Sequence, residues 1–291
     1  MAPAPTDTLL QRRRLAARLR ELRAGAGLTL DDVAGHLGCT NSKISKIENA
    51  RQVCLPQDLR RMADLYGVAA DERAVLEELA ARGRSSEQPW WRAYSDTVPE
   101  RYAEFLGFES EAQGELEYQT VIIPGLLQTE PYARAVTAVG FASLGPDQVD
   151  ALVEVRMRRQ RILTQDAPLQ YACVITEAAL HFRVGGPAAR REQLAHLAAC
   201  AELPNVTIQV IPYAAGADGT QTGAFSIIQL GDGDPDVAFA ESVSGSFLIE
   251  DARHLRRLHR LYRSLASAAL PPGDSVHMIT QLREHDPRKD S

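Results

Sequence analysis

With 291 residues, the chain is too long for one small module and suits two domains, each able to bury a core. Its composition, 45% hydrophobic and 24% charged, is ordinary for a globular protein in water, and no apolar run is long enough for a membrane-spanning helix. The start of the chain lacks the apolar run of a secretory signal, so we expect a cytoplasmic protein.

The net charge of −6 is unevenly distributed along the chain. Residues 1–61 contain 11 Arg and Lys against 6 Asp and Glu, whereas residues 62–291 contain 21 against 32. Because salt screens each charge beyond about 10 Å, a local basic patch can attract phosphate groups even on an acidic protein. A solvated basic helix would give the same composition, so both interpretations stay open.

Amphipathic spacing predicts a first helix over residues 9–24, and the glycines after it end the helix. Thr29 is a good N-cap for a second helix over residues 30–37, and Asp31 and Asp32 would lie in its first turn, where the helix dipole favours anions. The chain therefore begins with short helices joined by brief turns.

Gly38 stops the second helix, and Thr40 can cap a third helix after a turn of only three residues. Apolar spacing turns Ile44 and Ile47 of that third helix inward. Two further helices are expected over residues 56–67 and 71–82. Five helices of this kind form one all-α bundle, which we assign to residues 1–83.

The polar segment over residues 84–92 contains Pro and lacks an apolar period, which predicts a linker. Helices are expected beyond it over residues 109–117, 132–139, 147–163, 188–202 and 251–269. Strands are expected over residues 169–176, 206–212, 225–230 and 237–243. The predicted fold is α+β overall: the all-α bundle is followed by a larger α+β domain over residues 93–285.

A tight turn between two helices, with short polar residues facing outward on the second, is the arrangement that fits a DNA major groove. Side chains near the start of such a helix reach base edges. Base contacts are predicted for Asn41, Ser42, Ser45 and Lys46. Phosphate contacts, which set register and affinity, are predicted for Thr29, Thr40, Lys43, Asn49 and Arg51. A related module that binds protein is the alternative.

The segment LTLDDVAGHLGCTNSKISKIENAR resembles the helix-turn-helix of the phage-repressor and Xre family of transcriptional regulators, over roughly residues 9–70. The resemblance implies a structural ion pair between Glu48 in the third helix and Arg23 in the first. The family often has Gln at the first position of the second helix, where it contacts phosphate. This chain has Leu30 there, so that contact should be missing.

Several later segments, namely WWRAYSD, IIPGLLQTEPYARAV, EAALHFRVGG, LPNVTIQVIPY and FLIED, resemble the large C-terminal domain of actinobacterial Xre-type regulators. That domain is a domain of unknown function, DUF5753. The resemblance implies an association with a small partner protein and a role in the control of development or secondary metabolism.

Aromatic residues, which are only 6% of the chain, gather at the start of the second domain. Aromatic side chains contribute much of the binding energy in pockets and interfaces, but they also pack in cores. Glu177 and His181, four residues apart, would share one face of a helix. The candidate pocket for a ligand or partner consists of Trp90, Trp91, Tyr94, Tyr118, Tyr132, Glu177 and His181.

Motifs for catalysis and metal binding are missing from the sequence. The four cysteines form no C-x-x-C pair, and the seven histidines form no H-E-x-x-H. A nucleophile elbow and a phosphate-binding loop are also missing. We therefore expect reduced thiols, no cofactor, no metal and no enzymatic activity; an exposed redox-sensing thiol and an enzyme with a DNA-binding appendage are the weaker alternatives.

The leading hypothesis is a sequence-specific transcriptional regulator that binds double-stranded DNA as a homodimer in the cytoplasm, associated with the nucleoid. Its second domain would dimerise and sense a small molecule or a partner protein. The alternative is an antitoxin-like interaction protein whose second domain holds a small partner protein.

Overall fold

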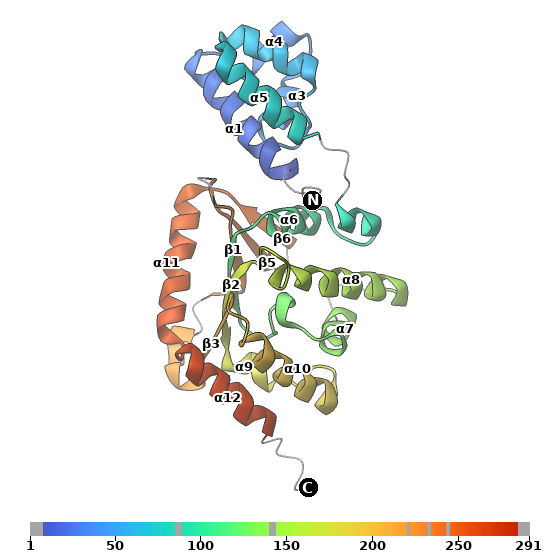
Figure 1. Ribbon diagram of the computed structural model, residues 1–291, viewed down its shortest axis with the longest axis vertical. Helices are drawn as coiled ribbons and strands as arrows, with labels where there is room; N and C mark the ends of the chain where they lie inside the picture. Colours follow the sequence, from blue (N-terminus) through green and yellow to red (C-terminus); the bar gives the residue numbers. More distant parts are fainter. Residues whose placement is uncertain are drawn as a thin grey trace. The chain divides into compact units, whose positions relative to one another are not determined.

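Figure 1 shows the computed structural model, which describes residues 8–84, 89–139, 144–219, 222–231, 234–242 and 245–284. Two units divide the chain, Met1–Trp90 and Trp91–Ser291. Part of the linker predicted over residues 84–92, namely residues 85–88, lies outside the described residues.

Among its described residues, the first unit contains helices and no strands. The helix bounds are α1 Thr8–Gly25, α2 Leu30–Leu37, α3 Asn41–Glu48, α4 Pro56–Tyr66 and α5 Ala70–Arg82. Leu19, Ile44, Met62 and Leu76 come from four different helices and are all completely buried in one shared core. The five-helix bundle predicted from the sequence is therefore confirmed.

Local capping explains where these helices begin and end. Thr29 and Asp32 form a reciprocal capping box at the start of α2, with the Asp32 amide donating to Thr29 Oγ1 at 3.2 Å. Gly38 and Gly67 end α2 and α4 in the left-handed conformation, each with a φ of 68°. Pro56 occupies the first turn of α4, where its missing N–H costs nothing.

The second unit is built on one six-stranded mixed sheet in the order β3-β2-β1-β4-β5-β6. The strands are β1 Gly114–Gln119, β2 Gln170–Thr176, β3 Val206–Ile211, β4 Phe225–Gln229, β5 Val237–Ser242 and β6 Gly245–Ile249. Pairing is parallel between β1, β2 and β3 and antiparallel between β1, β4, β5 and β6. The strand direction therefore changes at β1, which pairs with β2 on one side and with β4 on the other.

The helices of this unit are α6 Glu100–Ser110, α7 Glu130–Ala138, α8 Pro146–Arg159, α9 Glu177–His181, α10 Gly186–Cys200, α11 Ala252–Ala268 and α12 Pro272–Glu284. The described residues also form the 3-10 turns η1 Trp90–Tyr94, which starts at the last residue of the first unit, η2 Gly125–Leu127, η3 Gln160–Leu163 and η4 Tyr213–Gly219. The α+β class predicted for this domain is confirmed.

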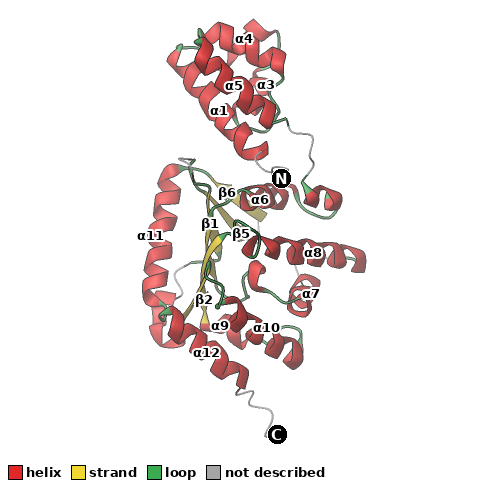
Figure 2. Ribbon diagram, in the orientation of Figure 1, coloured by secondary structure: helices red, strands yellow, loops and turns green. Residues whose placement is uncertain are grey.

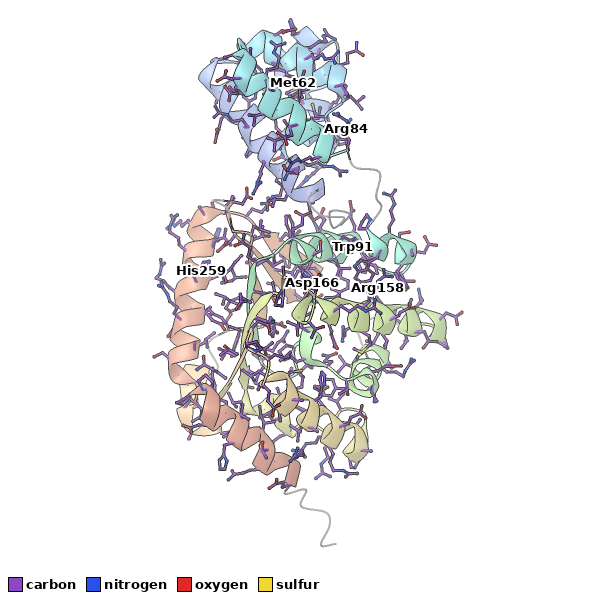
Figure 3. All side chains as sticks on the ribbon, in the orientation of Figure 1. Met62, Arg84, Trp91, Arg158, Asp166 and His259 are labelled. Atoms are coloured by element: carbon purple, nitrogen blue, oxygen red, sulfur yellow. The ribbon has the colours of Figure 1, made fainter. Side chains whose placement is uncertain are left out.

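Helices cover both faces of the sheet (Figure 2). Leu255, Tyr262 and Leu265 of α11 pack in one apolar cluster with residues of β1, β2 and β4. Leu197 of α10 and Ile279 of α12 belong to a second cluster with the alternate residues of β2 and β3. In Figure 3, His259 of α11 and Arg158 of α8 accordingly lie on opposite sides of the sheet.

The helix predicted over residues 109–117 is wrong. α6 ends at Ser110, and Gly114–Gln119 forms β1, the strand at which the sheet changes direction. Glu115 and Glu117 have low intrinsic β propensity, so their composition favoured a helix. Pairing with two strands more than fifty residues away overrides that preference, and no local pattern reveals it. The strand β6 and the helix α12 were also not predicted.

Cys54, Cys173 and Cys200 are buried, and all four cysteines are free thiols. Burial raises the pKa of the Cys54 thiol to about 12 and that of the Cys200 thiol to about 11. Both side chains therefore stay protonated near neutral pH, which is the behaviour of packed thiols. Within the described ranges, no helix combines the length and apolar character needed to cross a membrane.

Candidate nucleic-acid interface

α2 and α3 are separated by three residues, and their turn is set by backbone hydrogen bonds. The left-handed Gly38 donates its N–H to the carbonyls of Ala34 and Gly35, and the Cys39 N–H donates to Ala34 O at 3.0 Å. Thr40 then caps α3 by accepting the Lys43 N–H at 3.3 Å. The turn fixes the direction in which α3 leaves α2.

The inward face of α3 is apolar apart from one carboxylate. Ile44, Ile47 and Glu48 are at most 2% exposed, whereas Ser42 and Lys46 on the other side are exposed. Asn41 and Ser45 are half-buried on the same outward face. The structure therefore brings the four predicted base readers together on one short, polar helix surface.

Glu48 is held by a fork from α1. Arg23 Nε donates to Glu48 Oε1 at 2.8 Å and Arg23 Nη2 donates to Glu48 Oε2 at 2.9 Å, while Arg23 Nη1 donates to Leu28 O at 2.9 Å. Arg20, one turn earlier, donates to the Glu48 carbonyl and to Asn49 Oδ1. Two arginines of α1 thus fix the C-terminal end of α3.

α3 ends in a left-handed residue that is not glycine. Ala50 has a φ of 55°, and the following Arg51 N–H returns to Lys46 O at 2.8 Å. The turn leaves the Arg51 side chain exposed. Asn49 is exposed too, but its amide is engaged on both sides, because it accepts from Arg20 and donates to Ser45 O at 2.7 Å.

Two predicted DNA contacts already have carboxylate partners. Asn41 Nδ2 donates to Asp31 Oδ1 at 2.7 Å, and Lys43 Nζ lies 2.7 Å from Asp58 Oδ2. The hydrogen bond with Asp58 raises the pKa of Lys43. Lys46, by contrast, forms no ion pair within the described part of the chain, so its ammonium group is the one most free to meet DNA.

The other two predicted phosphate contacts are the caps themselves. Thr29 Oγ1 donates to Asp32 Oδ2 at 2.6 Å while accepting the Asp32 N–H, so its hydroxyl is saturated by the capping box. Thr40 is exposed at the start of α3. Leu30 packs partly buried against the core of the bundle.

Sequence reasoning missed two residues that shape this surface. Arg61 of α4 donates to the carbonyls of Leu37, at 2.7 Å, and His36, which are among the last carbonyls of α2. Asp58 holds Lys43 from the first turn of the same helix. Both contacts join residues at least fifteen positions apart, and only the packing of α4 reveals them.

The seven residues proposed for a pocket lie in different clusters and turns of the structure. Tyr118 is completely buried in the cluster under α11, and Tyr132, 2% exposed, belongs to the cluster on the other face. Trp90, Trp91 and Tyr94 form the turn η1 (Figure 3 labels Trp91). A hydrogen bond with Glu154 of α8 raises the pKa of Tyr94.

Glu177 and His181 lie together in a separate surface group with Tyr213. Their side chains are 3.2 Å apart, the Tyr213 N–H donates to Glu177 Oε2 at 2.7 Å, and the His181 and Tyr213 rings lie 5.6 Å apart. Among the described residues, no group of three or more His, Cys, Asp and Glu side chains is placed to hold a metal ion.

These features define a protein in which a helix-turn-helix precedes an α+β domain. Residues 14–76 match the family described as a helix-turn-helix domain, and residues 102–281 match the family described as domain of unknown function DUF5753. Because the second match spans more than half of the chain, this protein belongs to the DUF5753 family. The predicted combination of the two domains is thereby confirmed. A search of curated proteins and a search of solved structures found no match.

Proposed function

We propose that this protein is a sequence-specific transcriptional regulator that inserts α3 into the DNA major groove. The observation that supports this best is the outward face of α3, where short polar side chains surround the exposed Lys46. A groove about 12 Å wide admits one helix, and short side chains allow its backbone to approach the bases. A helix-turn-helix domain indicates DNA binding independently of these side chains.

The side-chain contacts rank the proposed base readers. Lys46 is exposed and needs to break no ion pair before it reaches a guanine acceptor. Asn41 must exchange its bond to Asp31 for an adenine edge. Ser42 and Ser45 contribute hydroxyl contacts. Lys46 is therefore the principal reader of sequence in this proposal.

The proposed phosphate contacts differ in which existing side-chain interactions must be broken before they form. Arg51 and Thr40 are exposed, and Arg51 lies just beyond the left-handed end of α3. Lys43 must leave Asp58 or share its charge with it, and Asn49 must loosen its bond to Arg20. We therefore assign most of the phosphate affinity to Arg51.

One short helix contacts only a few base pairs, so a regulator of this kind needs a second copy on a related half-site. We assign dimerisation and the sensing of an effector to the second unit, since the first unit is occupied by its own small core. The protein would work in the cytoplasm, bound to the nucleoid.

The test begins with selection of bound sequences from a random DNA library by the full-length chain, followed by gel-shift titrations. Lys46→Ala should lose about 1–3 kcal/mol of discrimination at one base pair. Lys43→Ala should weaken all sequences alike and reduce the salt slope by less than about 1, because Lys43 shares its charge with Asp58. Arg82→Ala is the matched control, because it removes a charge that is 58% exposed and that belongs to α5 and not to α3.

Identical effects of Lys46→Ala and Lys43→Ala across operator variants would refute the assignment of Lys46 as a base contact and of Lys43 as a phosphate contact. Failure to select any DNA sequence would refute the proposed function. Co-purification with a small partner protein at fixed stoichiometry would, in that case, favour the interaction-protein hypothesis.

A further inference from the structure

The second unit contains a pocket of about 260 Å³ beside the strand where the sheet changes direction. Its walls come from α6, α8, β1 and the antiparallel strands β4, β5 and β6. None of the seven residues predicted to form a pocket lines it. The lining combines an apolar wall with a small number of charged and amide groups, as ligand sites do.

A buried ion pair lies against this pocket. Arg159 of α8 donates to both oxygens of Glu109, at 2.8 and 2.5 Å, and also to the Tyr102 hydroxyl at 2.6 Å. The Arg159 and Glu109 side chains are only 8% and 4% exposed. The guanidinium group of Arg159 is therefore fully engaged by Glu109 and Tyr102, so Arg159 has a structural role at the wall of the pocket.

Two more carboxyl groups of β1 share this region. Burial raises the pKa of Glu115 well above its ordinary value, and the charges of Glu109 and Glu117 raise it further. Burial also raises the pKa of Glu117, although that side chain accepts hydrogen bonds from Tyr171 and from Gln119. Burial therefore disfavours the charged form of both Glu115 and Glu117 beside the pocket.

Arg156, one helical turn before Arg159, is the cation that remains unmatched. Its Nη1 donates to Gln128 Oε1 at 2.8 Å, and Gln128 is itself fixed by its bond to Ile123 O at 2.6 Å. Arg156 Nε is buried without a hydrogen-bond partner, and no carboxylate in the described part of the chain forms an ion pair with Arg156. A guanidinium group aimed into a pocket with donors to spare points to an anionic ligand.

The remaining lining restricts that ligand further. Phe105 and Phe239, with ring centroids 4.6 Å apart, supply an aromatic wall together with Ile122 and Leu152. Glu241, an exposed residue that also lines the pocket, would repel a second negative charge. The volume is just below the usual range of about 300–1,000 Å³ for small-molecule sites.

We propose that this pocket binds a small monocarboxylate with an apolar body, whose carboxylate accepts hydrogen bonds from Arg156 while its body packs against Phe239 and Leu152. A planar carboxylate matches the fork of a guanidinium group, and Arg156, the cation without an ion pair among the described residues that line the pocket, balances one negative charge. The claim that this ligand is the effector of a regulator rests on the proposed function. The claim that the second unit binds it does not.

The experiment measures binding by calorimetry to the full-length protein without DNA. The probes are phenylpropionate, its neutral analogue phenylpropanamide and its cationic analogue phenylpropylamine. The carboxylate should bind, and the amide and the amine should not. Arg156→Gln should weaken binding of the carboxylate by roughly 10- to 150-fold, because a hydrogen bond to a charged group contributes about 1.5–3 kcal/mol. Arg158→Gln, two positions along the same helix and exposed, should leave affinity unchanged.

Leu152→Trp provides a second variant that fills the pocket while leaving Arg156 in place, so it tests the site even where Arg156→Gln fails to fold. Loss of binding in a folded Leu152→Trp protein supports the assignment. Equal binding of the carboxylate and the amide, preference for the amine, no binding of phenylpropionate at millimolar concentration, or full binding by Leu152→Trp would each overturn it.

Gel shifts with and without phenylpropionate separate this inference from the proposed function. Binding of the carboxylate to a chain that selects no operator would leave the pocket assignment standing and remove the regulator. If the chain bound an operator but none of the three probes, the regulator would stand and the pocket assignment would be refuted.

Discussion

Removing one side of the Arg23–Glu48 fork should strongly destabilise the first unit. Glu48 is 2% exposed and receives two charged hydrogen bonds, while the third donor of Arg23 satisfies the Leu28 carbonyl in the turn before α2. Arg23→Met leaves that carboxylate buried without its cation. Glu48→Gln strands the arginine instead, whose side chain is 17% exposed and can reach water.

Removing one partner of a buried pair costs about 3–5 kcal/mol, because an uncompensated charge stays behind. Two hydrogen bonds to charged groups, at about 1.5–3 kcal/mol each, give a range that overlaps this one. The loss of stability should lie at the upper end of this range for Arg23→Met and at the lower end for Glu48→Gln. The double variant should cost less than the two single changes together.

Amide hydrogen exchange on the full-length chain gives a local measurement of this loss. Exchange of the buried amides of α1 and α3 should become at least about 150-fold faster, which corresponds to about 3 kcal/mol. The amides of β2 belong to the second unit and serve as the internal control. Less than about tenfold acceleration in both single variants would refute the reasoning, since it would mean that the charge left behind reaches water or another partner instead of staying buried and uncompensated.

Three further outcomes follow from the same contacts. Ala50→Gly should stabilise the first unit by about 0.5–1 kcal/mol in urea denaturation, because the left-handed backbone strains any residue with a Cβ. Asp58→Asn should free Lys43, raising DNA affinity in gel shifts and steepening its dependence on salt. The pKa of Glu115 is raised in the folded state, so the stability that it contributes is complete below its ordinary pKa of 4.5 and is lost as pH rises towards the folded pKa. Over that window the wild type should lose up to about 1.4 kcal/mol per pH unit through this group, and Glu115→Gln should abolish that part of the slope.

Each of these outcomes has its own control. Ala50→Ser keeps a Cβ and should bring no stabilisation. Asp64→Asn removes an exposed carboxylate from the same helix as Asp58. Because Asp64 pairs with Arg73 and not with Lys43, this change should leave DNA affinity nearly unchanged. Glu202→Gln, at an exposed position, should leave the pH profile of stability as it is in the wild type. An unchanged profile in Glu115→Gln would contradict the buried-carboxyl argument.

The first unit could be predicted well because its signals are local. The Thr40 cap, the left-handed Gly38 and the spacing of Ile44 and Ile47 lie within a few residues of one another. Each of them acts through backbone groups or through one shared helix face. The outward side of α3 follows directly, because fixing the buried side of a helix determines the rest.

The second unit was harder because its decisive contacts are distant in sequence. Glu115 and Glu117 read as helix formers, and only pairing of β1 with β2 and β4 turns them into a buried acidic face. In the sequence, Arg156 cannot be told apart from the other arginines of α8. Its position in the pocket depends on Gln128, twenty-eight residues away.

The reversal of strand direction at β1 also bears on how the chain folds during synthesis. The first unit ends its last helix at Arg82, whereas Gly114 pairs with Gln229. At about 5–20 residues per second, roughly 7–30 s separate the emergence of these two points from the ribosome. A complete helix-turn-helix is therefore available on the nascent chain before its sheet can close, so the proposed DNA binding would arise earlier in the life of each molecule than its proposed control by an effector.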